Sequence, residues 1–137
     1  MSEKAPIPAE GLNARGLSAS LTVNDIDRSL AWYHNVLGCA VDRKFEREGK
    51  LMAVSLRAGE ARILITQDDG SKGADRIKGE GFSLMMTTAQ NIDSIAAGIH
   101  ARGGVLDSEP SDTRWGQRMF RLRDPDGFRY TISSERA

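Results

Sequence analysis

The residues of this 137-residue chain that could do chemistry are suited to holding a ligand. One set falls on a common face of predicted strands, with a loop tryptophan beside it: Ser18, Ser20, Ser83, Met85, Met119, Arg121, Thr131 and Trp115. Arginine binds carboxylates and phosphates through two hydrogen bonds, methionine adapts to irregular shapes, and tryptophan stacks on planar rings. The set predicts a binding site for a sizeable, partly polar organic molecule.

Some of these residues have a second interpretation. For Arg121, as for Arg123 and Arg129, it is a solvated position near a strand end. For Trp115 it is packing against its own half of the chain or against a partner subunit. The sequence leaves both questions open.

The sequence assigns no catalytic residues. It has no Ser–His–Asp order, phosphate-binding loop, paired-cysteine spacing or paired carboxylates. His34 and His100 fall within predicted helices and are interpreted as solvated surface residues. Cys39 follows a helix stop with no histidine close in sequence, and it is interpreted as a buried, inert thiol.

Composition narrows the class of protein. The chain has 19 basic and 19 acidic residues, so its net charge favours neither a nucleic acid nor a membrane partner. One cysteine allows no internal disulfide, which favours a cytoplasmic location. No stretch approaches the ~20 apolar residues of a membrane span. Residues 1–14 contain prolines but no apolar run, and we expect a flexible tail followed by one domain over 15–137.

The elements that would position these residues come from a repeat. Ser18 and Ser83 are 65 residues apart, and so are Gly38 and Gly103, each following the same strand-like and helix-like pattern. The repeat predicts two modules, about 16–67 and 81–134, with a cleft between them. Residues 68–73, rich in glycine and aspartate, are the predicted linker.

Each module is predicted to follow the order βαβββ, which makes the fold class α+β. Periodicity and turn residues locate strands at 17–23, 51–57, 61–66, 82–88, 118–123 and 128–133, and helices at 26–37 and 92–99. The strands at 51–57 and 61–66 follow the charged stretch 42–50. Alternation makes Val54, Leu56, Phe120 and Leu122 core residues, and their neighbours in sequence then face the cleft.

Several short motifs resemble the vicinal oxygen chelate superfamily, which contains glyoxalase I, bleomycin-resistance proteins and extradiol dioxygenases. They are the runs 21–26, 29–33 and 36–38, and Asp124-Pro125-Asp126-Gly127-Phe128. Together they cover about residues 16–134. The resemblance implies a glyoxalase/bleomycin-resistance-type domain.

Metal-dependent members of that superfamily place a His or Glu on the first strand of each module and a Glu on its last strand. The resemblance carries these positions to Ser18, Ser83, Thr131 and either Ile63 or Leu64. Hydroxyl and alkyl groups hold divalent transition metals poorly. We therefore expect no metal and no other cofactor, and the metal-dependent reactions are disfavoured.

The function predicted from the sequence is metal-independent binding of a drug-like compound or metabolite, which the protein would sequester as bleomycin-resistance proteins do. The resemblance also implies a homodimer. One alternative is a metal-independent isomerase, lyase or cyclase of the same superfamily, which lacks a convincing general base on the cleft face. Another is a degenerate module that binds a protein.

Overall fold

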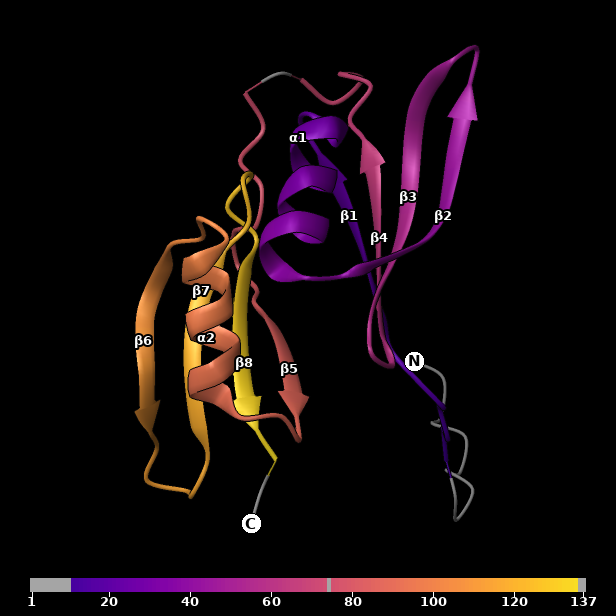
Figure 1. Ribbon diagram of the computed structural model, residues 1–137. Coiled ribbons are helices and arrows are strands. Elements are labelled where there is room, and N and C mark those ends of the chain that lie inside the picture. The colour runs from indigo at the N-terminus through magenta and orange to yellow at the C-terminus, as the bar shows by residue number, and fades with distance from the viewer. Residues whose placement is uncertain (1–10, 74, 136–137) are drawn as a thin grey trace.

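The protein, seen as a computed structural model, is described over residues 11–73 and 75–135. Figure 1 shows its elements in two successive groups. In order along the chain they are β1 (Ser18–Val23), α1 (Ile26–Ala31), η1 (Trp32–Leu37), β2 (Ala40–Arg47), β3 (Lys50–Ala58), β4 (Ala61–Gln67), β5 (Leu84–Thr88), α2 (Ile92–Ala101), β6 (Leu106–Asp112), β7 (Arg118–Arg123) and β8 (Arg129–Ser134). This confirms the α+β class and the βαβββ order in each module.

Each module forms its own four-stranded sheet, with strand orders β1-β4-β3-β2 and β5-β8-β7-β6. The first strand of each module pairs in parallel with the last, and the other neighbours are antiparallel. The two sheets therefore repeat one topology, as the 65-residue spacing predicted. Residues 1–10, most of the predicted tail, lie outside the described residues, while 11–17 are exposed.

Local sequence explains the helix boundaries. The Asp25 carboxylate accepts hydrogen bonds from the backbone N–H groups of Asp27 and Arg28 and so caps α1. At the other end the helix continues as a π-helical turn, η1, and stops at Gly38, whose φ of 92° favours glycine. Gly103, with a φ of 90°, follows α2 in the same way.

The sequence assigned no strand to residues 42–50. They belong largely to β2, and β2 pairs along most of its length with β3. Nearly every residue of β2 is exposed, so the strand lacks the alternation of apolar and polar residues that marks a half-buried strand. The same reason explains why β6, another mostly exposed edge strand, was not located from the sequence.

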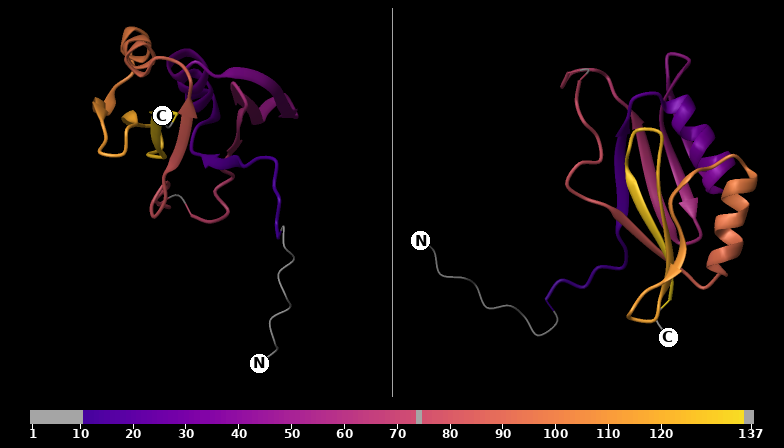
Figure 2. Two further views of the ribbon diagram at one scale, coloured as in Figure 1. Left: turned by 90° about the horizontal axis from the view of Figure 1, so that it is seen from below. Right: turned by 90° about the vertical axis from the view of Figure 1, so that its left-hand side faces the viewer.

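Both helices cover the same side of the molecule, and Figure 2 shows the sheets on the other side. We call the sheet surfaces that face away from the helices the helix-free faces. The predicted core residues Val54, Leu56, Phe120 and Leu122 lie on the helix side and are at most 1% exposed. Their burial confirms the predicted core side of β3 and β7.

A buried cluster of three residues joins the modules, and we call it the clasp: Tyr33 of η1, Tyr130 of β8 and Asp124 of the β7–β8 turn. The Tyr33 hydroxyl donates to Asp124 Oδ2 at 2.7 Å and lies 2.9 Å from the Tyr130 hydroxyl. Asp124 Oδ1 accepts from the backbone N–H groups of Asp126 and Phe128 at 2.9 and 2.8 Å. The clasp thus fixes the first module's helix to the second module's hairpin.

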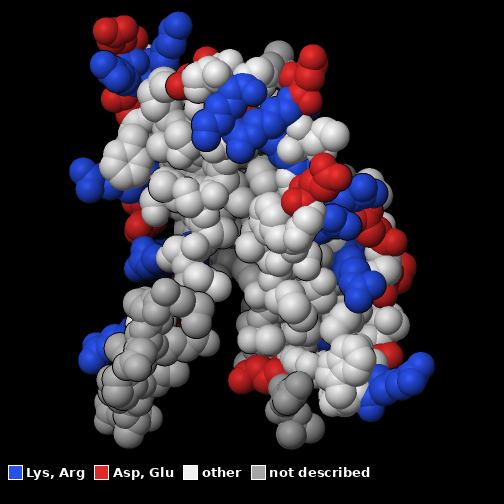
Figure 3. Space-filling model, turned by 180° about the vertical axis from the view of Figure 1, so that it is seen from behind, with Lys and Arg blue, Asp and Glu red and all other residues white. Residues whose placement is uncertain are grey.

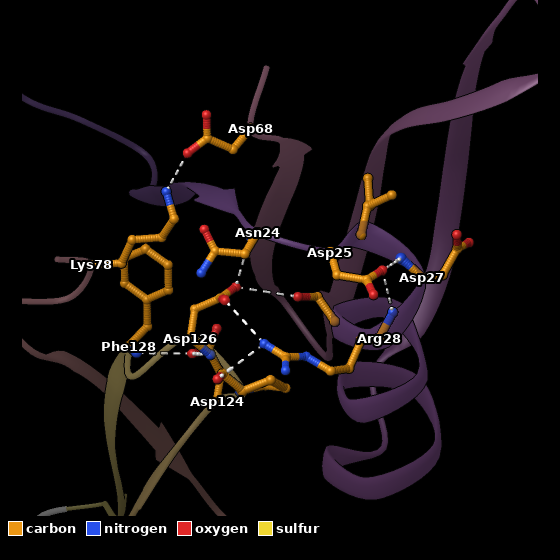
Figure 4. A network of polar contacts seen from close by, with 12 residues as sticks. Asn24, Asp25, Asp27, Arg28, Asp68, Lys78, Asp124, Asp126 and Phe128 are labelled. Carbon is orange, nitrogen blue, oxygen red and sulfur yellow. Dashed lines mark hydrogen bonds and ion pairs between the residues drawn. The ribbon is translucent and has the colours of Figure 1, made fainter. Parts of the chain in front are cut away.

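Asp126 adds a second contact between the modules (Figure 4). Its fully buried carboxylate lies 3.3 Å from Arg28 Nη2 and accepts from the backbone N–H of Asn24 at 3.2 Å. In the same view Lys78, which lies between the linker and β5, is paired at 2.6 Å with Asp68, the residue that follows β4. The predicted turn over 124–127 is confirmed by a 3.0 Å hydrogen bond from Gly127 N to Asp124 O.

We expect Asp124→Ala to destabilise the protein by about 3 kcal/mol, because it leaves the buried Tyr33 hydroxyl and two backbone N–H groups without partners. Urea denaturation measures the loss. Arg62→Ala is the control, since Arg62 and its ion-pair partner Asp42 are both exposed, at 55% and 41%, and the pair contributes at most about 1 kcal/mol. A loss below 1 kcal/mol for Asp124→Ala would contradict the role of the clasp.

Candidate functional site

The second sheet brings three predicted site residues together on its helix-free face. Met85 of β5 is the register partner of Thr131 on β8, and Thr131 is the partner of Arg121 on β7. Arg121 is next to Ser108 of β6. We call these four residues the Arg121 row. A parallel row, two residues along each strand, contains Thr87, Ser133 and Met119.

Exposure divides these side chains into two kinds. Met85 is 69% exposed and Arg121 is also exposed, so both are available to a ligand. Thr131 and Met119 are only 7% and 8% exposed. They form the floor of the face, where a ligand would meet a few atoms of each.

The first sheet carries the other hydroxyl residues. Ser20 on β1 is the register partner of Leu64 on β4, and Leu64 is the partner of Ser55 on β3. Ser18 lies on the same face of β1, two residues before Ser20, and is the register partner of Arg62. Both serines are exposed, so this face is also open. The predicted residues therefore form two groups, one on each sheet.

Two predicted residues lie outside the strands. Ser83 is exposed and immediately precedes β5. Trp115 lies in the loop between β6 and β7, which Thr113 closes by hydrogen bonds to Gln117. Because Trp115 is 59% exposed, it does not pack into its own module. It remains a candidate for stacking on a ligand or for contact with another chain.

The molecule is hollowed between its two halves on the helix-free side (Figure 3). Separately, a groove of about 970 Å³ lies between the modules, lined by α2, the end of η1, the β3–β4 turn and the end of β5. None of the eight predicted site residues lines it. Its polar lining includes His34 and Arg102, and Arg102 Nε donates to Val36 O at 3.0 Å. The sequence predicted a cleft between the modules but assigned other residues to it, because the walls of this groove come from both modules and depend on how the modules are placed.

The histidines and the cysteine lie as predicted. His34 is exposed, with Nδ1 2.8 Å from the Cys39 carbonyl oxygen. His100 is exposed and lies 3.0 Å from Glu109, which raises the pKa of the imidazole. Cys39 is 2% exposed, and burial raises the pKa of its thiol to about 11, so the thiolate that a nucleophile requires is disfavoured.

The structure also decides which residue occupies the fourth metal-ligand position implied by the resemblance. Ile63 is buried in the core, whereas Leu64 lies on the helix-free face, so the position is Leu64. With Ser18, Ser83 and Thr131 it makes a set of one alkyl group and three neutral hydroxyls. These residues do not fit a divalent metal. In the described part of the chain, no three His, Cys, Asp or Glu side chains are grouped so that they could hold one.

Comparison with known proteins gives the class. The family model described as Glyoxalase/Bleomycin resistance protein/Dioxygenase superfamily matches residues 17–132, and the chain belongs to this superfamily. A probable lactoylglutathione lyase of Vibrio cholerae is 31% identical over 122 residues, covering 85% of this chain and 87% of that protein.

Solved structures agree on the fold. A member of the same superfamily from Sphaerobacter thermophilus is 25% identical with a TM-score of 0.69, covering 90% of this chain and 98% of that one. TioX from Micromonospora sp. ML1 is 18% identical with a TM-score of 0.69, covering 89% and 97%, and this likeness concerns the fold alone. Among the described residues, no helix has the length and apolar character needed to cross a membrane.

The electrostatics of the clasp are set by burial. Burial raises the pKa values of the Tyr33 and Tyr130 hydroxyls, and the neighbouring Asp124 carboxylate raises them further. The pKa of the Asp124 carboxyl group is also raised, because the effect of burial exceeds the opposite effect of the hydrogen bonds that it accepts. The folded state therefore favours protonated tyrosines beside Asp124.

This predicts a dependence of stability on alkaline pH. Both tyrosine pKa values are higher in the folded state than in the unfolded state. Their contribution to the free energy of unfolding is therefore fully present below about pH 10 and is lost as the pH rises above that value. Above that pH, each tyrosine lowers the free energy of unfolding by about 1.4 kcal/mol per pH unit. Since the chain has two tyrosines, absorbance at 295 nm should show no tyrosinate until the near-ultraviolet circular dichroism of the fold disappears. Tyrosinate appearing in the folded protein near pH 10 would contradict the buried network.

Proposed function

We propose that this member of the superfamily is a metal-independent binding protein that sequesters a drug-like compound or metabolite in the cytoplasm. The proposal rests on Ser18, Leu64, Ser83 and Thr131, the residues at the positions that the resemblance assigns to the metal ligands of metal-dependent members. Three hydroxyls and a leucine leave the helix-free faces able to contact an organic molecule but poorly able to bind a metal.

The chemistry of the faces supports binding. Hydroxyls of Ser18 and Ser20 offer hydrogen bonds on one sheet, while the other presents an exposed methionine and arginine in Met85 and Arg121. Methionine adapts its shape to apolar parts of a ligand, and arginine binds its polar groups. Trp115, from the β6–β7 loop, is available to stack on a planar ring.

The relatives favour a second candidate. A protein 31% identical to this chain bears the name probable lactoylglutathione lyase. An enzyme of the superfamily acting without the usual metal, or with an atypical site, is therefore the alternative. Assaying lactoylglutathione lyase activity with and without added Zn²⁺ or Ni²⁺ distinguishes the two. Turnover in either condition would favour the enzyme.

We predict that binding needs no metal. Elemental analysis of dialysed protein should find far less than one transition metal per chain, because the donor set is unsuitable. Titration with 2-naphthoate, a planar aromatic carboxylate, should quench tryptophan fluorescence equally with and without EDTA, and Trp115→Ala should remove most of the quenching. Stoichiometric Zn, Ni, Mn or Fe, or binding that EDTA abolishes, would refute the proposal.

We also propose a homodimer. The helix-free faces are open in a single chain, and exposed apolar side chains lie on both of them, Phe45 on the first and Met85 on the second. A second copy would bury these side chains and close the ligand site.

The dimer predicts a solution mass of twice the 15.0 kDa chain. Light scattering coupled to size-exclusion chromatography at micromolar concentration measures it. Dilution of the sample should shift the mass toward one chain, because the equilibrium depends on concentration. A mass of one chain throughout the micromolar range would contradict the dimer.

A further inference from the structure

The charged residues of the strands are unevenly divided between the two sides of the molecule. The helix-free faces carry six arginines and two aspartates: Arg43, Arg57, Arg62, Arg121, Arg123, Arg129, Asp42 and Asp107. These faces therefore have an excess of four positive charges in a chain whose net charge is zero. The rest of the chain carries the matching acidic excess. In Figure 3, charged groups surround a white, hollowed centre on this side.

Five of the six arginines are engaged within the protein. Arg57 and Arg62 lie 3.8 and 3.3 Å from Asp42, and Arg123 lies 2.9 Å from Asp107. The guanidinium of Arg43 lies 5.0 Å from the centre of the Phe45 ring, and Arg129 donates to Gly79 O at 3.4 Å. For Arg121 the described residues supply no ion pair or hydrogen bond, and its side chain is exposed. Arg43 and Arg121 therefore have no ion pair or hydrogen bond among the described residues, and Arg121 lacks an aromatic contact as well, so it is the arginine of these faces most open to a ligand.

The surroundings of Arg121 suit an oxyanion. Its register partners on either side are Thr131 and Ser108, so a hydroxyl residue flanks it on each neighbouring strand. Met85, beyond Thr131, adds an exposed apolar side chain to the same row. A planar guanidinium binds a carboxylate or phosphate through two charge-assisted hydrogen bonds, and hydroxyls can donate to the remaining oxygens.

We propose that the ligand of the helix-free faces is an anion, and that its carboxylate or phosphate group binds Arg121. This inference rests on the proposed function, because it concerns the same faces. The excess positive charge attracts anions to the site and disfavours cations of similar size. The ring or chain that bears the anionic group would lie toward Met85.

Four compounds with one naphthalene ring isolate the effect of charge: 2-naphthyl phosphate, 2-naphthoate, 2-naphthalenemethanol and 2-naphthylmethylammonium. We expect both anions to bind the full chain about tenfold more tightly than the alcohol at low salt, and the ammonium ion to bind most weakly. The preference should shrink in 0.5 M NaCl, because salt screens exposed charges. Comparison of the two anions shows whether the site prefers a carboxylate or a phosphate.

Substitutions assign the preference to Arg121. Arg121→Gln should abolish the anion preference, and Arg121→Glu should reverse it toward the ammonium ion. Lys44→Gln is the matched control, because it removes one positive charge on the helix side, where Lys44 lines a pocket with Ile26 and Leu30 of the first helix region. It should leave the preference unchanged. Thermal melts of each variant confirm that the fold is intact.

The outcomes separate this inference from the proposed function. Equal binding of the alcohol and the anions, or a preference that survives Arg121→Gln, would overturn the anion assignment while leaving small-molecule binding in place. Binding of none of the four compounds would overturn both.

Discussion

The hydrogen bond between the Tyr33 hydroxyl and the Asp124 carboxylate joins the first module's helix to the second module's hairpin. Asp124 also holds its own turn through two backbone N–H groups, so one buried carboxyl group organises the hairpin and attaches it. Burial makes each of these bonds costly to lose, because no water replaces a missing partner. The relative placement of the two sheets depends on this contact and on the buried Asp126 beside it.

Each helix packs on the sheet of its own module, α1 on β3 and β4 and α2 on β6, β7 and β8, and this placement determines where a ligand can bind. With α1 and α2 on one side, both sheets turn their other faces the same way (Figure 2). Residues from β1 and β4 in one module, and from β5, β7 and β8 in the other, then share one side of the molecule. The repeat thus gives two similar faces, but their chemistry differs, with hydroxyls prominent on the first and Met85 and Arg121 on the second.

The sequence predicted those features that local patterns encode. Alternation identified the core side of β3 and β7, and left-handed glycines marked the helix ends, because both depend on a few neighbouring residues. It did not locate β2 or β6, since an exposed edge strand needs no alternation. The Arg121 row required the register of β5, β8 and β7, and the groove between the modules required their relative placement. Both are long-range properties.

The balanced net charge of the chain conceals how its charges are arranged. The net charge of the whole chain favoured neither a nucleic acid nor a membrane partner. One side nevertheless holds most of the strand arginines. On that side, the exposed side chain of Arg121 has no ion pair or hydrogen bond among the described residues. If the helix-free faces of two copies meet in a dimer, positive surfaces approach each other, and their repulsion opposes association. An anion bound at Arg121 would reduce that repulsion. Ligand binding and dimer formation would then favour each other, because linkage between two equilibria is reciprocal.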